Sequence, residues 1–271
     1  MGIILGRGDE AKKAIEGNGG GLDLSKVFIR LKAGQSRKVR ILSKFDYVAY
    51  KAHGHFTNGI NTTPCIKPMD ERCLMCEAAN YDGELVDGVT IGKVKQQNGN
   101  EVSEWASMYA KKRVLFAFVD LEDGEEGEDG KPEGMLRVFD ATKNQADGLI
   151  ATIDEYGDDL DMAFTFKRTG EKNETSYTLN PIMPKKMAEI QDTFDKWEGK
   201  EVPDSLFEEA LPTLSTEDMA KELQKGGFPV KAALGFNVKA SENEESESSK
   251  DEDEGTPTNG KEDISEDDLP L

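Results

Sequence analysis

The sequence has few of the residues that build disulfide frameworks, and it has no long apolar run. Three cysteines and two histidines occur in 271 residues. No stretch approaches the ~20 consecutive apolar residues that a membrane-spanning helix needs. Three cysteines are too few for a disulfide framework in a chain of this length, which favours a reducing compartment. The first ten residues hold an apolar run of only three and two acidic residues, unlike a secretory signal. We therefore expect a cytoplasmic protein without a membrane-embedded part.

All the histidines and cysteines lie within 24 residues. Cys73 and Cys76 have a spacing that lets two thiolates bind one ion from a turn at a helix start, and Cys65 and one histidine can complete a tetrahedron. Thiolates with one imidazole favour Zn2+, and four protein ligands leave no position for water. We predict a structural zinc site formed by His53, Cys65, Cys73 and Cys76. His55 stays open as the alternate ligand, because strand alternation puts both histidines on one face.

Two other interpretations of the cysteines are weaker. They can be free buried thiols beside two surface histidines, although such tight clustering is improbable for scattered residues. Cys73 and Cys76 can also be a redox pair, but no thioredoxin-like βαβ pattern surrounds them.

Negative charge dominates the composition but is concentrated in three segments. The formal net charge is −20, and residues 241–271, 120–133 and 198–225 carry −11, −7 and −5 of it. The remaining residues therefore sum to +3, and residues 26–51 alone carry +7. Such a basic run is either a solvated strand face or an electrostatic footprint for an anionic polymer.

Alternating apolar residues predict a mainly β core of α+β class. Residues 27–32 and 37–42 are predicted to form a hairpin, and a third strand follows from 45 to about 55. The later pattern predicts strands at 114–121, 135–140, 160–168 and 175–179, and helices at 9–16, 73–80, 101–110 and 143–156. This order suits a Greek-key barrel of the OB type. A two-sheet sandwich fits the strand count nearly as well.

Composition divides the chain into four predicted parts. Residues 1–24 are a flexible arm containing a glycine-rich linker, and residues 25–182 are the OB-fold core, with the zinc subdomain at about 53–80. Residues 183–239 are an acidic appendage with helices at 184–197, 203–211 and 215–225. Residues 240–271 have almost no apolar side chains and are predicted to be a disordered acidic tail.

Basic and aromatic residues are interleaved near the predicted third strand and before residue 114. Proteins bind single strands with cations that contact the phosphates and aromatic rings that stack on the bases. Duplex recognition instead uses a helix that reads base edges, and no basic helix is predicted here. Individual aromatic residues are more often part of a core. The predicted nucleic-acid-binding residues are Arg37, Lys38, Arg40, Lys44, Tyr47, Tyr50, Lys51, Trp105, Tyr109, Lys111, Lys112 and Arg113.

The acidic tail ends in a small apolar tip, Asp267, Asp268, Leu269, Pro270 and Leu271. A tail that only solvates the protein needs no such tip. We expect the acidic segment to compete with nucleic acid for the basic groove, and the tip to bind a pocket of a partner protein.

These motifs together resemble those of known single-strand-binding proteins. The tip is similar to that of bacterial single-stranded DNA-binding proteins, which end in Asp-Asp-Asp-Ile-Pro-Phe. The body resembles the helix-destabilising proteins of large tailed phages over roughly residues 25–180. The matching features are Leu31 and Gly34 before residues 39–42, the His53/Cys65/Cys73/Cys76 set, and residues 113–119.

The resemblance implies an OB fold with a zinc subdomain and a protein that coats single-stranded DNA in replication, recombination and repair. It also implies cooperative self-association on DNA, replication and recombination proteins as partners of the tail, and the cytoplasm of a bacterial host as the location. No enzymatic activity is expected.

Two other functions compete with this interpretation. The carboxylates of Asp158, Asp159 and Asp161 can hold Mg2+ in a nuclease, although acids at a helix-to-strand turn are commonly solvated. The chain can also be a zinc-bearing protein-interaction module that mimics DNA with its acidic segments.

Overall fold

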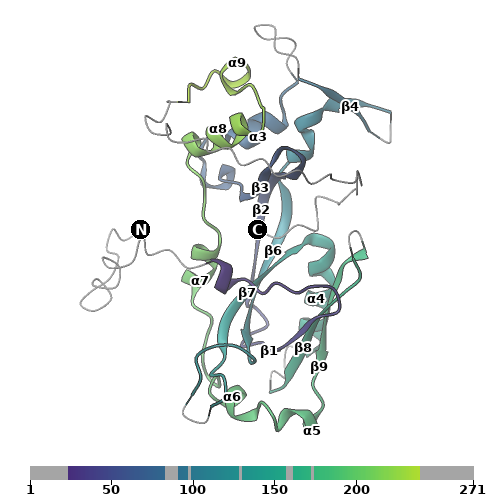
Figure 1. The fold of residues 1–271 in the computed structure, drawn as a ribbon, viewed down its shortest axis with the longest axis vertical. Coiled ribbons are helices and arrows are strands. Elements are labelled where there is room, and N and C mark those ends of the chain that lie inside the picture. Colours follow the sequence, from purple (N-terminus) through teal and green to yellow (C-terminus); the bar gives the residue numbers. More distant parts are fainter. Residues whose placement is uncertain are drawn as a thin grey trace, which may run out of the picture. The chain divides into compact units, whose positions relative to one another are not determined.

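The computed structural model describes residues 24–82, 91–96, 99–127, 130–156, 161–171 and 174–238. These residues form a mixed α+β fold whose strands pair mainly antiparallel (Figure 1). The predicted helix at 9–16 and the predicted tail at 240–271 lie outside the described residues. Within the described ranges, no helix is both long and apolar enough to cross a membrane.

The described strands and helices follow one another as labelled in Figure 1. The strands are β1 (Ser36–Arg40), β2 (Tyr47–His55), β3 (Ile60–Pro64), β4 (Lys93–Lys95), β5 (Glu101–Ser103), β6 (Lys111–Asp120), β7 (Met135–Thr142), β8 (Ala163–Thr169) and β9 (Ser176–Pro181). The α-helices are α2 (Leu24–Val27), α3 (Leu74–Ala79), α4 (Lys143–Tyr156), α5 (Pro184–Met187), α6 (Gln191–Asp195), α7 (Asp204–Ala210), α8 (Thr216–Lys225) and α9 (Val230–Leu234). Three 3-10 helices are η1 (Phe56–Asn58), η2 (Lys67–Met69) and η3 (Glu104–Met108).

The chain divides into two compact units. Unit 1 comprises Met1–Tyr50 and Lys112–Pro212, and unit 2 comprises Lys51–Lys111 and Thr213–Leu271. The division falls within β2 and near the start of β6. Helices α5 to α7 belong to unit 1 and α8 and α9 to unit 2, so the predicted helical appendage at 183–239 is not a unit of its own.

Unit 1 is built on two antiparallel hairpins that flank a helix. Strand β6 pairs with β7 along their length, from Arg113 opposite Thr142 to Asp120 opposite Met135. Helix α4 follows, and β8 then pairs with β9. Strand β1 lies between the hairpins, because it pairs with β8 along its length and with the end of β6. Among the described residues no pairing between β7 and β9 closes a barrel.

The core of unit 1 forms where the apolar faces of these strands meet α4. The helix buries Ala146, Leu149 and Ile153, which share one face at helical spacing. Phe116 and Phe118 of β6 and Phe166 of β8 are fully buried in the same cluster. The helix and the four later strands agree with the sequence prediction to within a few residues at their ends.

The first predicted hairpin does not form. Strand β1 covers part of 37–42, but its partners are β6 and β8, and residues 29–32 are not in a strand. Leu24–Val27 is helical, and Phe28 makes only an isolated parallel bridge with Val138. The prediction was wrong because β1 pairs with two strands that come later in the chain, β6 and β8, and not with the segment directly before it.

Unit 2 has its own apolar core around α3, with Leu74, Met75 and Ala78 fully buried. Met219, Ala220 and Leu223 of α8 pack into the same cluster. The side chain of Ser215 caps α8 by accepting the backbone N–H of Asp218 at 3.1 Å. This core therefore extends beyond the zinc subdomain predicted at about 53–80.

The turn between β1 and β2 contains a carboxyl group whose titration affects stability. Asp46 is half-buried, and this burial raises the pKa of its carboxyl to about 6, while the backbone N–H of Ser43 donates to it at 2.6 Å. Because the folded protein binds this proton more tightly than the unfolded chain, the contribution to stability is present below about pH 4 and lost as the pH rises through about 6. Asp46→Asn is expected to equal the wild type in unfolding free energy at pH 4 and to exceed it at pH 7. Urea unfolding of both proteins between pH 4 and pH 7 checks this prediction. A difference in unfolding free energy between variant and wild type that does not vary with pH would contradict it.

Candidate metal centre

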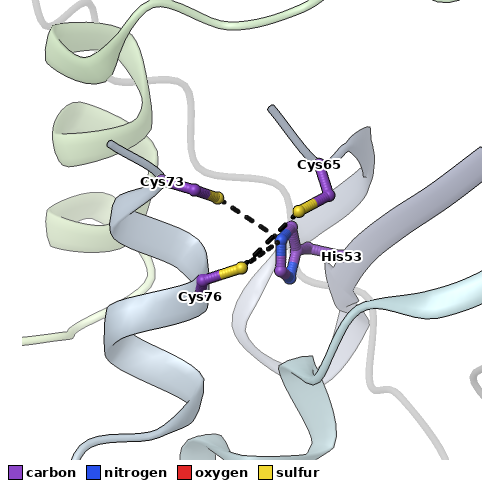
Figure 2. A group of neighbouring side chains, drawn as sticks. All are labelled: His53, Cys65, Cys73 and Cys76. Carbon is purple, nitrogen blue, oxygen red and sulfur yellow. Dashed lines mark hydrogen bonds between the residues drawn. The ribbon is translucent and has the colours of Figure 1, made fainter. Parts of the chain in front are cut away.

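Three segments of unit 2 bring four potential ligands together (Figure 2). His53 lies in β2, and Cys65 follows β3, where its backbone N–H donates to the carbonyl of Lys51 at 2.8 Å. Cys73 is the N-cap residue of α3, and Cys76 lies in the helix itself. The ligand atoms of the four residues all lie within 4.8 Å of one another.

The spacing of these atoms suits one tetrahedral ion. The Sγ atoms of Cys65 and Cys76 are 3.5 Å apart, and His53 Nε2 lies 3.4 Å from Cys73 Sγ and 3.5 Å from Cys76 Sγ. Bonds of about 2.0–2.3 Å at tetrahedral angles separate ligand atoms by about 3.4–3.8 Å. The His53/Cys65/Cys73/Cys76 group could therefore hold a metal ion.

The contacts of His53 orient its ring for coordination. Its Nδ1 lies 2.7 Å from the carbonyl oxygen of Met108. A carbonyl only accepts, so Nδ1 carries the proton and Nε2 directs its lone pair at the sulfur atoms. Burial lowers the pKa of His53, which favours the neutral imidazole that binds metals.

The thiols need a cation to ionise where they lie. Burial raises the pKa of Cys73 and of Cys76, and the neighbouring thiol of Cys65 adds to the shift at both, whereas hydrogen bonds with Cys76 lower the pKa of Cys73. Three thiolates crowded together would repel one another, whereas a divalent ion among them stabilises the deprotonated form. The donor set therefore fits a bound cation.

His55 is not part of this group. Its Nε2 lies 3.2 Å from the carbonyl oxygen of Glu104, and its ring centroid is 4.9 Å from that of Trp105. Both histidines are buried, as alternation along β2 predicts, and the extra residue at the register shift lies in β3. Parity therefore places them on one face, and their different positions along β2 give them different partners.

A hollow of about 420 Å³ opens beside the metal centre. Cys65 and Cys76 line it, together with the lysines Lys51 and Lys67 and the ring of Tyr109. Tyr109 is 50 % exposed, both lysines are exposed, and none of the described residues that line the hollow is acidic. A cationic hollow with an accessible aromatic face can accept a phosphate and a planar base.

Two of the predicted DNA-binding residues, Lys51 and Tyr109, are brought together by this hollow. Lys67 lies in η2 and was missed from sequence, because it is outside the basic run and has no aromatic neighbour in the chain. Its position in the hollow depends on the fold of the cysteine-bearing loop.

The cations of β1 are occupied within unit 1. Arg37 Nε lies 3.8 Å from Asp120, and Lys38 Nζ lies 3.3 Å from Glu189. The buried Arg40 donates to the carbonyl of Phe194 and stacks on its ring, with the guanidinium carbon 3.8 Å from the centroid. Exposed pairs such as that of Lys38 are weak and can yield to a phosphate. Arg40 is a buried structural residue in this structure.

Three further predicted binding residues are buried or partly buried. Arg113 makes an ion pair with Asp140 at 2.8 Å, and the Tyr50 hydroxyl donates to the same carboxylate at 2.9 Å. Trp105 is 2 % exposed and packs edge-on against Phe228. Arg113 and Trp105 offer a nucleic acid almost no surface, and the hydroxyl of the partly buried Tyr50 is engaged by Asp140. The sequence pattern gives the type of these residues but not what covers them.

The remaining predicted residues have mixed surroundings. Tyr47 is partly buried, with its ring centroid 5.6 Å from that of Phe116, whereas Lys111 and Lys112 are exposed. Lys44 lies beside the ring of Phe45. The predicted tail tip, residues 267–271, lies outside the described residues.

The carboxylates of the nuclease alternative gain no support from the structure. Asp158 and Asp159 lie outside the described residues, and the exposed Asp161 belongs to no group of potential metal ligands among those described.

Compared with known proteins, the chain matches no protein-family model and no curated sequence.

Proposed function

We propose that the chain is a non-enzymatic protein that binds single-stranded DNA without sequence preference. The observation that carries the proposal is the hollow of unit 2, where Lys51, Lys67 and the exposed ring of Tyr109 converge. Cations that hold phosphates beside a ring that stacks on bases suit a strand whose bases are unpaired.

The proposal includes a structural Zn2+ held by His53, Cys65, Cys73 and Cys76. Three thiolates and one imidazole favour zinc over harder cations, and four protein ligands leave no site for a reacting water. When bound, the ion cross-links β2, the loop after β3 and the start of α3. It thereby fixes one wall of the hollow, since Cys65 and Cys76 line it.

The proposed fold of unit 1 is a partly open OB barrel. The order of hairpin, helix and hairpin, with β1 paired to a strand of each hairpin, supports it. The wider proposal follows the resemblance: the protein coats DNA in replication, recombination and repair in a bacterial host cytoplasm, associates with itself on DNA, and recruits partner proteins through residues 267–271.

The test is binding of labelled oligo-dT and of a matched duplex by the full chain. We expect the single strand to bind and the duplex to bind far more weakly. The logarithm of affinity should fall with the logarithm of salt concentration by about 0.7 per phosphate contact. Absence of oligo-dT binding at low salt would refute the proposal, and release of nucleotides in Mg2+ would support the nuclease alternative.

A further inference from the structure

The turn between β1 and β2 presents an aromatic side chain that the proposed function has not used. Phe45 is 76 % exposed. Among the described residues, Phe45 and Tyr109 are the two aromatic members of the set of exposed large hydrophobic side chains. Tyr109 lines the hollow of unit 2, and Phe45 is an exposed aromatic side chain of unit 1.

The backbone of this turn is held by a dense set of hydrogen bonds. Asp46 N–H donates to the Ser43 carbonyl at 3.1 Å, and Phe45 N–H donates to Ser43 Oγ at 3.2 Å. Asp46 Oδ2 accepts the N–H of Ser43 at 2.6 Å, and the Asp46 carbonyl accepts the N–H of Ala117 in β6 at 2.9 Å. The exposed ring of Phe45 is thus carried on a backbone anchored to the sheet.

A cation accompanies the ring, as it does in the hollow of unit 2. The Nζ of Lys44 lies 5.6 Å from the centroid of the Phe45 ring, within the range of a cation–π contact. A base stacked on this ring would bring its phosphate within reach of a lysine on the adjacent residue.

The surroundings of Phe45 favour an unpaired base over a protein partner. Its sequence neighbours Leu42, Tyr47 and Val48 are all partly buried, so Phe45 is the one exposed large apolar side chain that the structure describes in this turn. Protein interfaces need a contiguous area, whereas one base needs one ring face and one cation.

We infer that Phe45 and Lys44 form a second nucleotide-binding site, in which an unpaired base stacks on Phe45 and the adjoining phosphate contacts Lys44. The inference rests on the proposed function and extends it to unit 1. Each unit then has an aromatic contact of its own for an unpaired base.

The experiment measures binding of labelled oligo-dT and of an abasic strand of the same length by the full chain. Phe45→Ala is expected to weaken oligo-dT binding about tenfold with an unchanged salt slope, because stacking involves no counterion release. Phe45→Leu keeps apolar bulk but lacks a ring face, so it should resemble Phe45→Ala, while Phe45→Tyr should restore binding. The abasic strand should bind the wild type and Phe45→Ala equally.

Two controls separate this site from general effects. Met183→Ala removes another side chain of unit 1 that is 70 % exposed, and it should leave the affinity unchanged. Thermal unfolding of Phe45→Ala should match the wild type, since the ring is mostly in solvent.

The outcomes are distinguishable from those that test the proposed function. Wild-type protein that binds no oligo-dT overturns both proposals. Wild-type binding with unchanged affinity in Phe45→Ala overturns the inference alone. Equal weakening on the abasic strand, or full binding by Phe45→Leu, also overturns it, because the contact would then not be base stacking.

Discussion

Replacing Cys73 with serine is expected to release bound zinc and to destabilise the core of unit 2. Cys73 belongs to that core, is 4 % exposed, and lies with its Sγ 4.0 Å from the Sδ of Met219 in α8. Loss of one ligand would leave the partly buried thiols of Cys65 and Cys76 without a complete site, and structural zinc sites contribute directly to folding free energy. We expect a loss on the order of several kcal/mol, less than in a zinc finger, because unit 2 has an apolar core of its own.

Trp105 offers a specific reporter of this change. The chain has two tryptophans, and Trp105 is 2 % exposed in unit 2 while Trp197 lies in unit 1. In a Trp197→Phe background, Cys73→Ser should shift the Trp105 emission to longer wavelength as water reaches the ring. In a Trp105→Phe background, the emission of Trp197 should stay unchanged. Zinc content is measured on the same samples by a chromogenic chelator.

The two histidines supply a matched pair for the same assay. His53→Gln should lose zinc, because its Nε2 faces the sulfur atoms of Cys73 and Cys76. His55→Gln should keep one equivalent, since the Nε2 of His55 faces the carbonyl of Glu104. The reverse result would show that the ligand set is wrong.

The sequence was sufficient to predict the metal group because its signal is local. All four residues of the group are histidine or cysteine, which are rare in this chain, and Cys73 and Cys76 lie about one helical turn apart. It was insufficient to choose between His53 and His55, because both lie on the buried face of β2. The choice depends on where along β2 the cysteine-bearing segments meet it, which alternation within β2 does not encode.

Predicted secondary structure was most accurate where one segment determines its own pattern. Helix α4 has its apolar residues at helical spacing, and the β6–β7 hairpin joins two apolar segments across an acidic, glycine-containing loop. The hairpin predicted at 27–32 and 37–42 failed because strand pairing is a competition between distant segments. There β8 and β6 displaced the neighbour in sequence.

The predicted nucleic-acid groove shows a different limit. Alternation along β1 separates Lys38 and Arg40 from the apolar face, but it does not show that a later element covers the polar face. Helix α6 supplies Phe194, which buries Arg40, and β7 supplies Asp140, which neutralises Arg113. Elements distant in sequence therefore bury or neutralise residues whose type alone had suggested that they contact nucleic acid.

Removing the three functional side chains of the unit 2 hollow is expected to have the largest effect on DNA binding. The variant combines Lys51→Gln, Lys67→Gln and Tyr109→Ala. Two lost phosphate contacts should reduce the salt slope by about 1.4, and loss of one stacked base should cost about 1–3 kcal/mol. Together they should lower the affinity for oligo-dT by on the order of 100-fold or more at low salt. Titrations at four salt concentrations measure both quantities.

The lysines have a competing role that a variant changed at the two lysines alone can test. Three thiolates and a divalent ion carry a net charge of −1, and Lys51 and Lys67 lie beside two of these ligands, Cys65 and Cys76, where they can balance that charge. Lys51→Gln combined with Lys67→Gln should keep one equivalent of zinc if the lysines serve the DNA. Loss of zinc with an unchanged salt slope would assign them to the metal centre. Val94→Ala, which alters a half-exposed side chain of the same unit outside the hollow, is the matched control and should change neither quantity.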